Sequence, residues 1–139
     1  MENYAELLQR IVEATLEQMC FVCLEACEPK VPDEALTARV VFRGPHAGHF
    51  VLAVERGLLA ELTENMTGGT ESEESDGVLK ELTNVLCGHA VVELFGSGKI
   101  FELGAPELVD QVEALQAAPI EMGFGDGRLL VRVCAERPS

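Results

Sequence analysis

The stretch LTARVVFRGPHAGHFVLAV, residues 36–54, decides the fold of this chain. Apolar residues alternate with other residues on either side of a central segment, a pattern typical of strands that bury one face. The apolar positions are Leu36, Ala38, Val40 and Phe42 in the first half, and Phe50, Leu52 and Val54 in the second. The segment 44–48, with two glycines and a proline, predicts a turn between them. Residues 36–54 therefore predict a pair of adjacent strands.

Helical periodicity flanks these strands on both sides. Apolar residues recur at helical spacing through residues 3–26, which predicts a long amphipathic helix that ends before two nearby prolines. A shorter helix is expected over residues 56–66, closed by Gly68 and Gly69.

The second half of the chain repeats this order in outline. An acidic run from Glu71 to Asp76 precedes an expected helix of about 76–92, where negative charge complements the helix dipole. Glycines within residues 96–98 are expected to end that helix.

Strands are expected again toward the C-terminus. One lies around residues 101–105 and is interrupted by Pro106, while residues 107–116 fit either a helix or a loop. Residues 120–133 predict a terminal hairpin that turns at Gly-Asp-Gly. These elements predict one domain, 1–139, with a weak internal α-β-β duplication. Its fold class is an α/β (α+β) two-layer sandwich with a largely antiparallel sheet.

Composition and charge exclude several classes of function. Ten Lys and Arg against 24 Asp and Glu give 139 residues a formal charge of −14, which would repel nucleic acid and anionic membranes. The first residues include Glu2 and Glu6 where a signal peptide would carry positive charge, and the apolar run 19–24 is too short to span a bilayer. We expect a cytoplasmic protein.

Five cysteines and three histidines are candidate ligands or nucleophiles. Cys20, Cys23 and Cys27 fall on one face of the expected first helix, which favours core cysteines, although metal binding and redox chemistry remain alternatives. His46 and His49 are expected to be loop residues, because zinc normally needs at least three protein ligands. His89 is expected in the core or at an interface on the apolar side of the second long helix, and no metal or cofactor site is expected on this chain.

Residues 76–88, DGVLKELTNVLCG, contain the most informative pattern in the sequence. On a helix, the apolar residues form one side, and Gly77, Glu81, Asn84 and Gly88 form a separate stripe about 130° away. Glycine and asparagine are poor helix formers, so this stripe sacrifices local stability and indicates function. The glycines would let another protein approach closely.

The spacing Glu81-x2-Asn84, followed by 21 residues and Pro106, resembles the signature of the CheC/CheX/FliY chemotaxis phosphatases. The order of elements is most similar to the single-site CheX-like members. An overlay of the two long helices puts Arg10 and Glu13 where Glu81 and Asn84 stand, so we expect one site.

This resemblance implies a phosphatase that hydrolyses the phosphoaspartate of a CheY-like response-regulator receiver domain. Asn84 would position the attacking water and Glu81 would pair with the receiver's lysine, while the receiver holds Mg²⁺. The resemblance also suggests a homodimer. Partner contacts are expected at Gly77, Lys80, Gly88 and Pro106.

Gly77 departs from the family pattern, which has Asp or Ser there, and Asp76 stands one position early. If the family residue caps the helix, Asp76 could substitute for it; if it contacts the receiver, activity would be weaker. The alternative functions are a non-catalytic receiver-binding or flagellar-switch adaptor and, from another class, a cysteine-based metal or redox protein. We also expect a strand from about 99 to 105 to return Pro106 to the side of Asn84.

Overall fold

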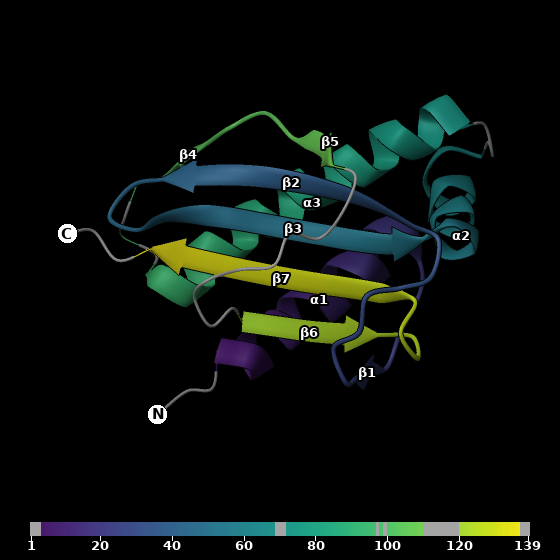
Figure 1. Cartoon of the computed structure of the whole chain (residues 1–139), viewed down its shortest axis with the longest axis horizontal. Helices are drawn as coiled ribbons and strands as arrows, with labels where there is room; N and C mark the ends of the chain where they lie inside the picture. Colours follow the sequence, from purple (N-terminus) through teal and green to yellow (C-terminus); the bar gives the residue numbers. More distant parts are fainter. Residues whose placement is uncertain (1–3, 69–71, 97, 99, 110–119, 137–139) are drawn as a thin grey trace.

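The computed structural model of the chain describes residues 4–68, 72–96, 98, 100–109 and 120–136. Within these parts, three helices pack on a seven-stranded sheet (Figure 1). The helices are α1 (Tyr4–Cys20), α2 (Arg56–Thr67) and α3 (Ser72–Phe95). The strands are β1 (Ala26–Cys27), β2 (Ala35–Arg43), β3 (Ala47–Glu55), β4 (Glu102–Leu103), β5 (Glu107–Val109), β6 (Ile120–Phe124) and β7 (Leu129–Glu136). All pairings are antiparallel, which confirms the predicted fold class.

The sheet has the order β1-β6-β7-β3-β2-β4, and β5 also pairs with β2. Its longest strands, β2, β3 and β7, therefore lie next to one another at the centre. β4 pairs with the C-terminal end of β2 and β5 with its N-terminal half, so two short strands share the outer edge of one long strand. Figure 1 shows α1 and α3 crossing behind the sheet, with α2 at one end.

The predicted strand pair over residues 36–54 is confirmed as the β2–β3 hairpin. Val40 lies opposite Phe50 and Ala38 opposite Leu52, so the alternating apolar residues of both strands point to the same face. Six of them have 0% exposure: Ala38, Val40, Phe42, Phe50, Leu52 and Val54. They form the core with the inner sides of the helices.

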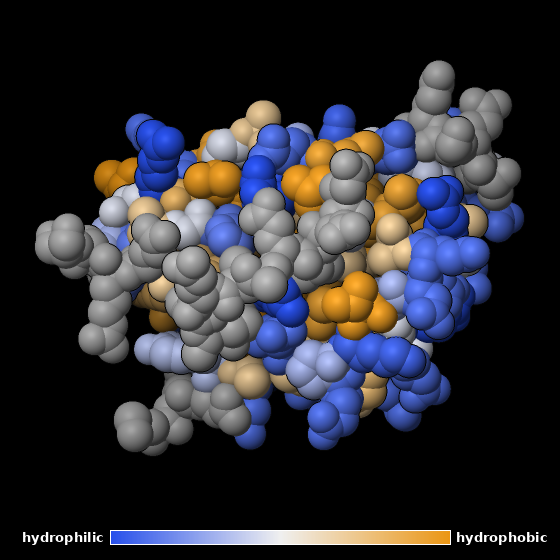
Figure 2. All heavy atoms as spheres, in the orientation of Figure 1, coloured by the Kyte–Doolittle hydropathy of each residue, from blue (hydrophilic) through white to orange (hydrophobic). Residues whose placement is uncertain are grey.

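The opposite face of the sheet carries ion pairs between neighbouring strands. Arg39 on β2 pairs with Glu107 on β5, and Arg132 on β7 pairs with Glu121 on β6 at 3.0 Å. Figure 2 shows this face, where hydrophobic side chains lie in separate patches between hydrophilic ones. The main core therefore lies on the side of the sheet that the helices cover.

The first helix ends at Cys20, six residues earlier than its apolar periodicity predicts. Phe21 adopts a left-handed backbone conformation with φ of 58°, which stops the helix. The following chain then pairs with the sheet, with Ala26 opposite Phe124. The prediction of a helix to residue 26 was wrong because these backbone groups hydrogen-bond with β6 instead.

The second long helix, α3, extends beyond its predicted bounds at both ends. It begins at Ser72, so Glu73, Glu74 and Asp76 of the acidic run lie inside its first turns rather than before them. At its other end, the Phe95 ring centroid lies 5.9 Å from that of Phe42 and 4.6 Å from that of His46. These ring contacts hold the last turn of α3 against the end of the sheet.

The C-terminal strands agree with the sequence in part. The strand expected around 101–105 is reduced to β4, because Gly104 donates its backbone N–H to the carbonyl of Val41 outside a regular ladder. Residues 107–109 form β5, and the rest of the ambiguous segment 107–116 lies outside the described residues. The terminal β6–β7 hairpin is confirmed.

Candidate active site

The expected division of α3 into a buried and an open side is present in the structure. Residues that face the sheet and the other helices are buried: Val78, Leu79, Leu82, Leu86 and Ala90. Glu81 and Lys80 are exposed, and Asn84 is half-buried. Because Glu81 and Asn84 are three residues apart, their Cβ atoms lie on the same side of the helix, about 5–6 Å apart.

Glu81 and Asn84 have no hydrogen bond or ion pair with another side chain among the described residues. Their polar groups are therefore not used to stabilise the described fold. A carboxylate accepts hydrogen bonds, and a carboxamide both donates and accepts them. The two side chains together offer one anionic group and one amide to a molecule that approaches α3 from outside.

Glycines border this pair along the helix. A Cβ atom at Gly77 would meet nothing within 4 Å, and one at Gly88 would meet only Leu103 Cδ1, at 3.7 Å. Both positions have room for a side chain, so packing within the described chain does not require glycine. Glycine at these positions lowers the stability of the helix, and the fold gives no reason for it. A role of the two glycines in contact with a partner would explain the choice.

Asp76 lies in the second turn of α3, because the helix begins at Ser72. Asp76 therefore does not cap the N-terminus of the helix, a role that the sequence had left possible. Gly77, one residue on, is exposed and lies within the helix. The family position that Gly77 occupies is thus a surface position beside Glu81.

The segment that contains Pro106, from β4 to β5, runs along α3 and contacts it at two places. Leu103 approaches Gly88, and β5 contacts α3. This segment starts at the C-terminal end of β2, where β4 pairs, and reaches the N-terminal half of β2, where β5 pairs. α3 runs in the opposite direction, because its last residue, Phe95, packs at the C-terminal end of β2. Pro106, which is half-buried, lies between these two contacts. The chain thus turns back toward the Asn84 level through short strands rather than one long strand.

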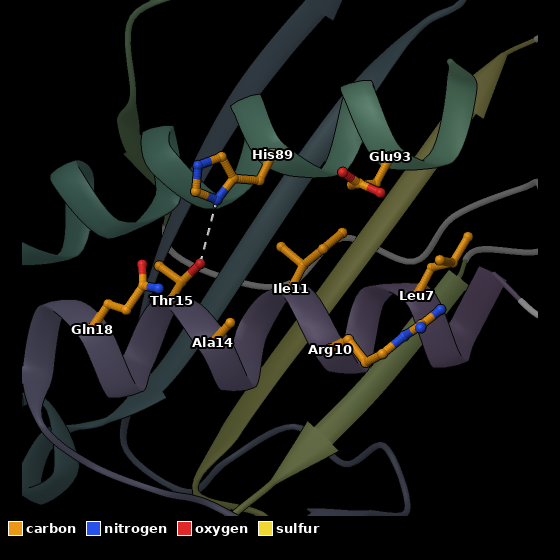
Figure 3. Close-up of a pocket in the computed structure, with 8 residues that line it drawn as sticks. All are labelled: Leu7, Arg10, Ile11, Ala14, Thr15, Gln18, His89 and Glu93. Carbon is orange, nitrogen blue, oxygen red and sulfur yellow. Dashed lines mark hydrogen bonds between the residues drawn. The ribbon is translucent and has the colours of Figure 1, made fainter. Parts of the chain in front are cut away.

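A groove lies between α1 and α3 on the outer side of the helical layer (Figure 3). It has a volume of about 560 Å³ and is lined by Leu7, Arg10, Ile11, Ala14, Thr15, Gln18, His89 and Glu93. The Thr15 hydroxyl and His89 Nδ1 lie 3.4 Å apart across it. No local pattern in the sequence could indicate this groove, because its two walls are 74 residues apart in the chain.

His89 is exposed at this groove, so the core alternative of its prediction is wrong, and the interface alternative stays a prediction. Its position on α3 faces α1 rather than the sheet, at the edge of the buried side. Arg10 also lines the groove, and Glu13 accepts a hydrogen bond of 2.9 Å from Gln9. The exposed glutamate and asparagine pair of α3 thus has no counterpart at Arg10 and Glu13 of α1.

The cysteines are dispersed, contrary to the prediction of a shared helical face. Cys20 is buried at the end of α1, Cys23 is exposed, and Cys27 is half-buried in β1. Burial raises the pKa of Cys20 to about 11 and that of Cys87 to about 12, which keeps both thiols protonated near neutral pH.

No three potential metal-binding side chains come together in the parts of the chain that the structure describes. His46 stacks on Phe95, and His49 belongs to β3 rather than to a loop. No described helix is long and apolar enough to cross a membrane.

The fold and this helix define a class of α+β protein in which a long helix both closes the core and presents an exposed glutamate and asparagine. Residues 36–121 match the family model described as chemotaxis phosphatase CheX, and the chain belongs to this family. Among curated protein sequences, none matches the chain.

Several solved structures share this fold. A chemotaxis protein CheX from Vibrio vulnificus is 20% identical, with a TM-score of 0.79 over 97% of each chain. A CheC-like superfamily protein from Shewanella sp. PV-4 is 21% identical, with a TM-score of 0.79 over 98% of this chain and 99% of that one. CheX in a CheX–CheY–BeF3–Mg²⁺ complex from Borrelia burgdorferi is 16% identical, with a TM-score of 0.70 over 96% of this chain and 98% of that one.

Proposed function

We propose that this chain hydrolyses the phosphoaspartate of a CheY-like receiver domain at Glu81 and Asn84. The observation that carries the proposal is the position of these two side chains, one turn apart on the open side of α3 and unbonded to described side chains. Membership of the chemotaxis phosphatase family supports it, as does the structural likeness to a CheX that was solved in complex with CheY.

Asn84 positions the attacking water. Its carboxamide enters the receiver's pocket, accepts one hydrogen bond from a water molecule and holds it in line with the phosphorus atom. The new bond from water oxygen to phosphorus forms as the bond to the aspartate oxygen breaks, which yields inorganic phosphate and a free carboxylate. Both protons of the water end on the inorganic phosphate, so the reaction needs no general base from this chain.

Glu81 anchors the complex by pairing with the lysine of the receiver. Such a charge-assisted contact is strong where the partner surface excludes water. Mg²⁺ belongs to the receiver, and this chain supplies no ligand that we assign to it. The lack of a side chain at exposed Gly77 and half-buried Gly88 allows close approach, and Lys80 and Pro106 border the contact.

The whole chain, 1–139, acts as one CheX-like domain in this proposal, and two copies form a homodimer. We propose the cytoplasm as the compartment of this reaction. Size-exclusion chromatography with light scattering tests the dimer directly, since one chain has a mass of 15.0 kDa.

The test is dephosphorylation of a CheY-type receiver that acetyl phosphate has loaded in the presence of Mg²⁺. Asn84→Ala should lower turnover by about 100-fold, as removal of a group that acts on the transition state does elsewhere. Glu81→Ala should raise KM by about tenfold, because it removes a charge-assisted anchor. The matched control is Glu93→Ala, the same change at another exposed site on α3, which should behave as wild type. Equal turnover by wild type and Asn84→Ala would refute the assignment.

A receiver-binding adaptor is the second candidate, favoured by glycine at position 77 where the family has Asp or Ser. Binding of the phosphorylated receiver without a change in its lifetime would identify this function. Gly77→Asp then tests the cause: the position has open space, so the substitution should fold and restore turnover if the missing side chain is responsible.

A further inference from the structure

The backbone of Phe21 is an outlier that the fold does not explain. Its φ of 58° lies in the left-handed region, where a residue with a Cβ atom is strained and glycine is usual just after a helix. The backbone N–H of Phe21 donates to the carbonyl of Glu17 at 3.2 Å, and that of Val22 donates to Leu16 at 3.4 Å. Glycine would make the same bonds with less strain.

The side chain of Phe21 is only slightly covered by the residues that the structure describes. It is 76% exposed, although a phenyl ring is among the most favourable groups to bury. A bulky apolar residue therefore stands at a position that favours glycine and leaves its ring in water. Such an outlier is a reason to look for a role outside the fold.

The end of α1, which Phe21 directly follows, lies at the same level as the candidate site along the helix axes, because α1 and α3 pack antiparallel. Figure 3 shows the pairing, with Thr15 opposite His89 and Leu7 near Glu93. Cys20 is five residues after Thr15, and Asn84 is five residues before His89. Because the helices are antiparallel, both residues lie about 7.5 Å from the Thr15–His89 contact, in the same direction along the helix axes. The end of α1 is therefore level with Asn84.

Contacts through α2 also bring the end of α1 toward the N-terminal half of α3. Asn65 on α2 donates a hydrogen bond of 2.8 Å to the carbonyl of Cys20. One half-turn away on α2, Thr63 Oγ1 lies 3.2 Å from Ser75 Oγ on α3. α2 thus contacts both the end of α1 and the N-terminal half of α3, which contains Gly77 and Glu81.

We infer that Phe21 is an apolar anchor of the surface that binds the phosphorylated receiver domain, an inference that rests on the proposed function. A typical protein interface covers about 800 Å² on each partner and is roughly 30 Å across, so a receiver centred on Asn84 covers the end of α1 as well. Because this chain has a charge of −14, long-range attraction to an acidic receiver pocket is absent. Burial of the Phe21 ring against the receiver would supply binding free energy that the charges of the two proteins do not.

The test compares Phe21→Gly with wild type on a receiver that wild type dephosphorylates. Phe21→Gly should raise KM about tenfold and leave kcat within about twofold, while the melting temperature rises because strain is relieved. The matched control is Ile100→Gly, which removes an 86% exposed apolar side chain beyond the other end of α3 and should leave KM unchanged. A rise in melting temperature also excludes misfolding as the cause.

An unchanged KM for Phe21→Gly would overturn the inference and leave the proposed function intact. A change in oligomeric state at unchanged KM would overturn it too, and would assign the ring to a contact between two copies. If wild type leaves the receiver phosphorylated and does not bind it, the proposed function fails first, and the role of Phe21 is withdrawn with it.

Discussion

Asn84 and Glu81 differ from most candidate catalytic residues because neither forms a hydrogen bond or ion pair with a described side chain. The groove between α1 and α3 is a separate feature, and its lining does not include either residue. The pair could be proposed from sequence because its signal is largely local: Asn84, a poor helix former, stands three residues after Glu81 on a stripe flanked by glycines. Phe21 was not predictable, because only the structure shows that its helix has already ended.

At the level of single residues, the two buried thiols predict how stability depends on pH. In the unfolded chain, Cys20 and Cys87 have the ordinary thiol pKa of 9.0, and burial in the fold raises the pKa to about 11 and about 12. Between pH 9 and pH 11 the unfolded chain therefore binds fewer protons than the folded chain, so the free energy of unfolding decreases as pH rises. Below pH 8 these thiols should have no effect.

Urea unfolding at pH 8, 9.5 and 10.5 measures this slope. Cys87→Ala should reduce the slope across that range, whatever its effect on stability at pH 8. Cys23→Ala, which removes an exposed thiol, is the control and should leave the slope unchanged. A slope that persists in full without Cys87 would contradict the prediction.

At the level of elements, α3 predicts a conflict between stability and activity. Gly88→Ala should stabilise the chain by about 0.5–1 kcal/mol, because alanine is the better helix former and the nearest atom leaves room for a methyl group. The same methyl group should hinder approach of the receiver and raise KM. Thermal unfolding and receiver dephosphorylation measure the two effects on one sample.

A matched control for this change is Ala14→Gly on α1, an exposed helical position that lines the groove. It should lower stability by a similar amount and leave KM near the wild-type value. If Gly88→Ala stabilises the chain but KM stays constant, close approach at Gly88 is not part of binding.

The ends of elements were harder to predict than their existence. The β2–β3 hairpin follows from alternation within its own residues, and its register matches the sequence pattern. The end of α1, the short β4 and the presence of β5 depend on pairing with strands that are distant in sequence. Periodicity continues through such points, so tertiary hydrogen bonds, and not local preference, determine where each element stops.

At the level of the whole molecule, charge predicts the effect of salt. Of the described arginines, Arg39, Arg128 and Arg132 already pair with glutamates, so they contribute little positive field to a partner. Two acidic proteins repel each other, and salt screens that repulsion within about 10 Å at 0.1 M. KM for the receiver should therefore fall by about two- to threefold between 50 and 300 mM NaCl at constant Mg²⁺. A steep rise in KM would contradict the prediction.

One helix, α3, supplies both the centre of the core and the candidate site. Leu82 and Leu86 are fully buried on its inner side, while Glu81 and Asn84 occupy the outer side of the same two turns. The outer pair cannot shift without disturbing the inner pair, because both belong to one hydrogen-bonded segment. This coupling leaves little scope for switching the site by internal rearrangement. We therefore expect the activity of this surface to be controlled by occlusion, in which another molecule binds over the helix and blocks the site.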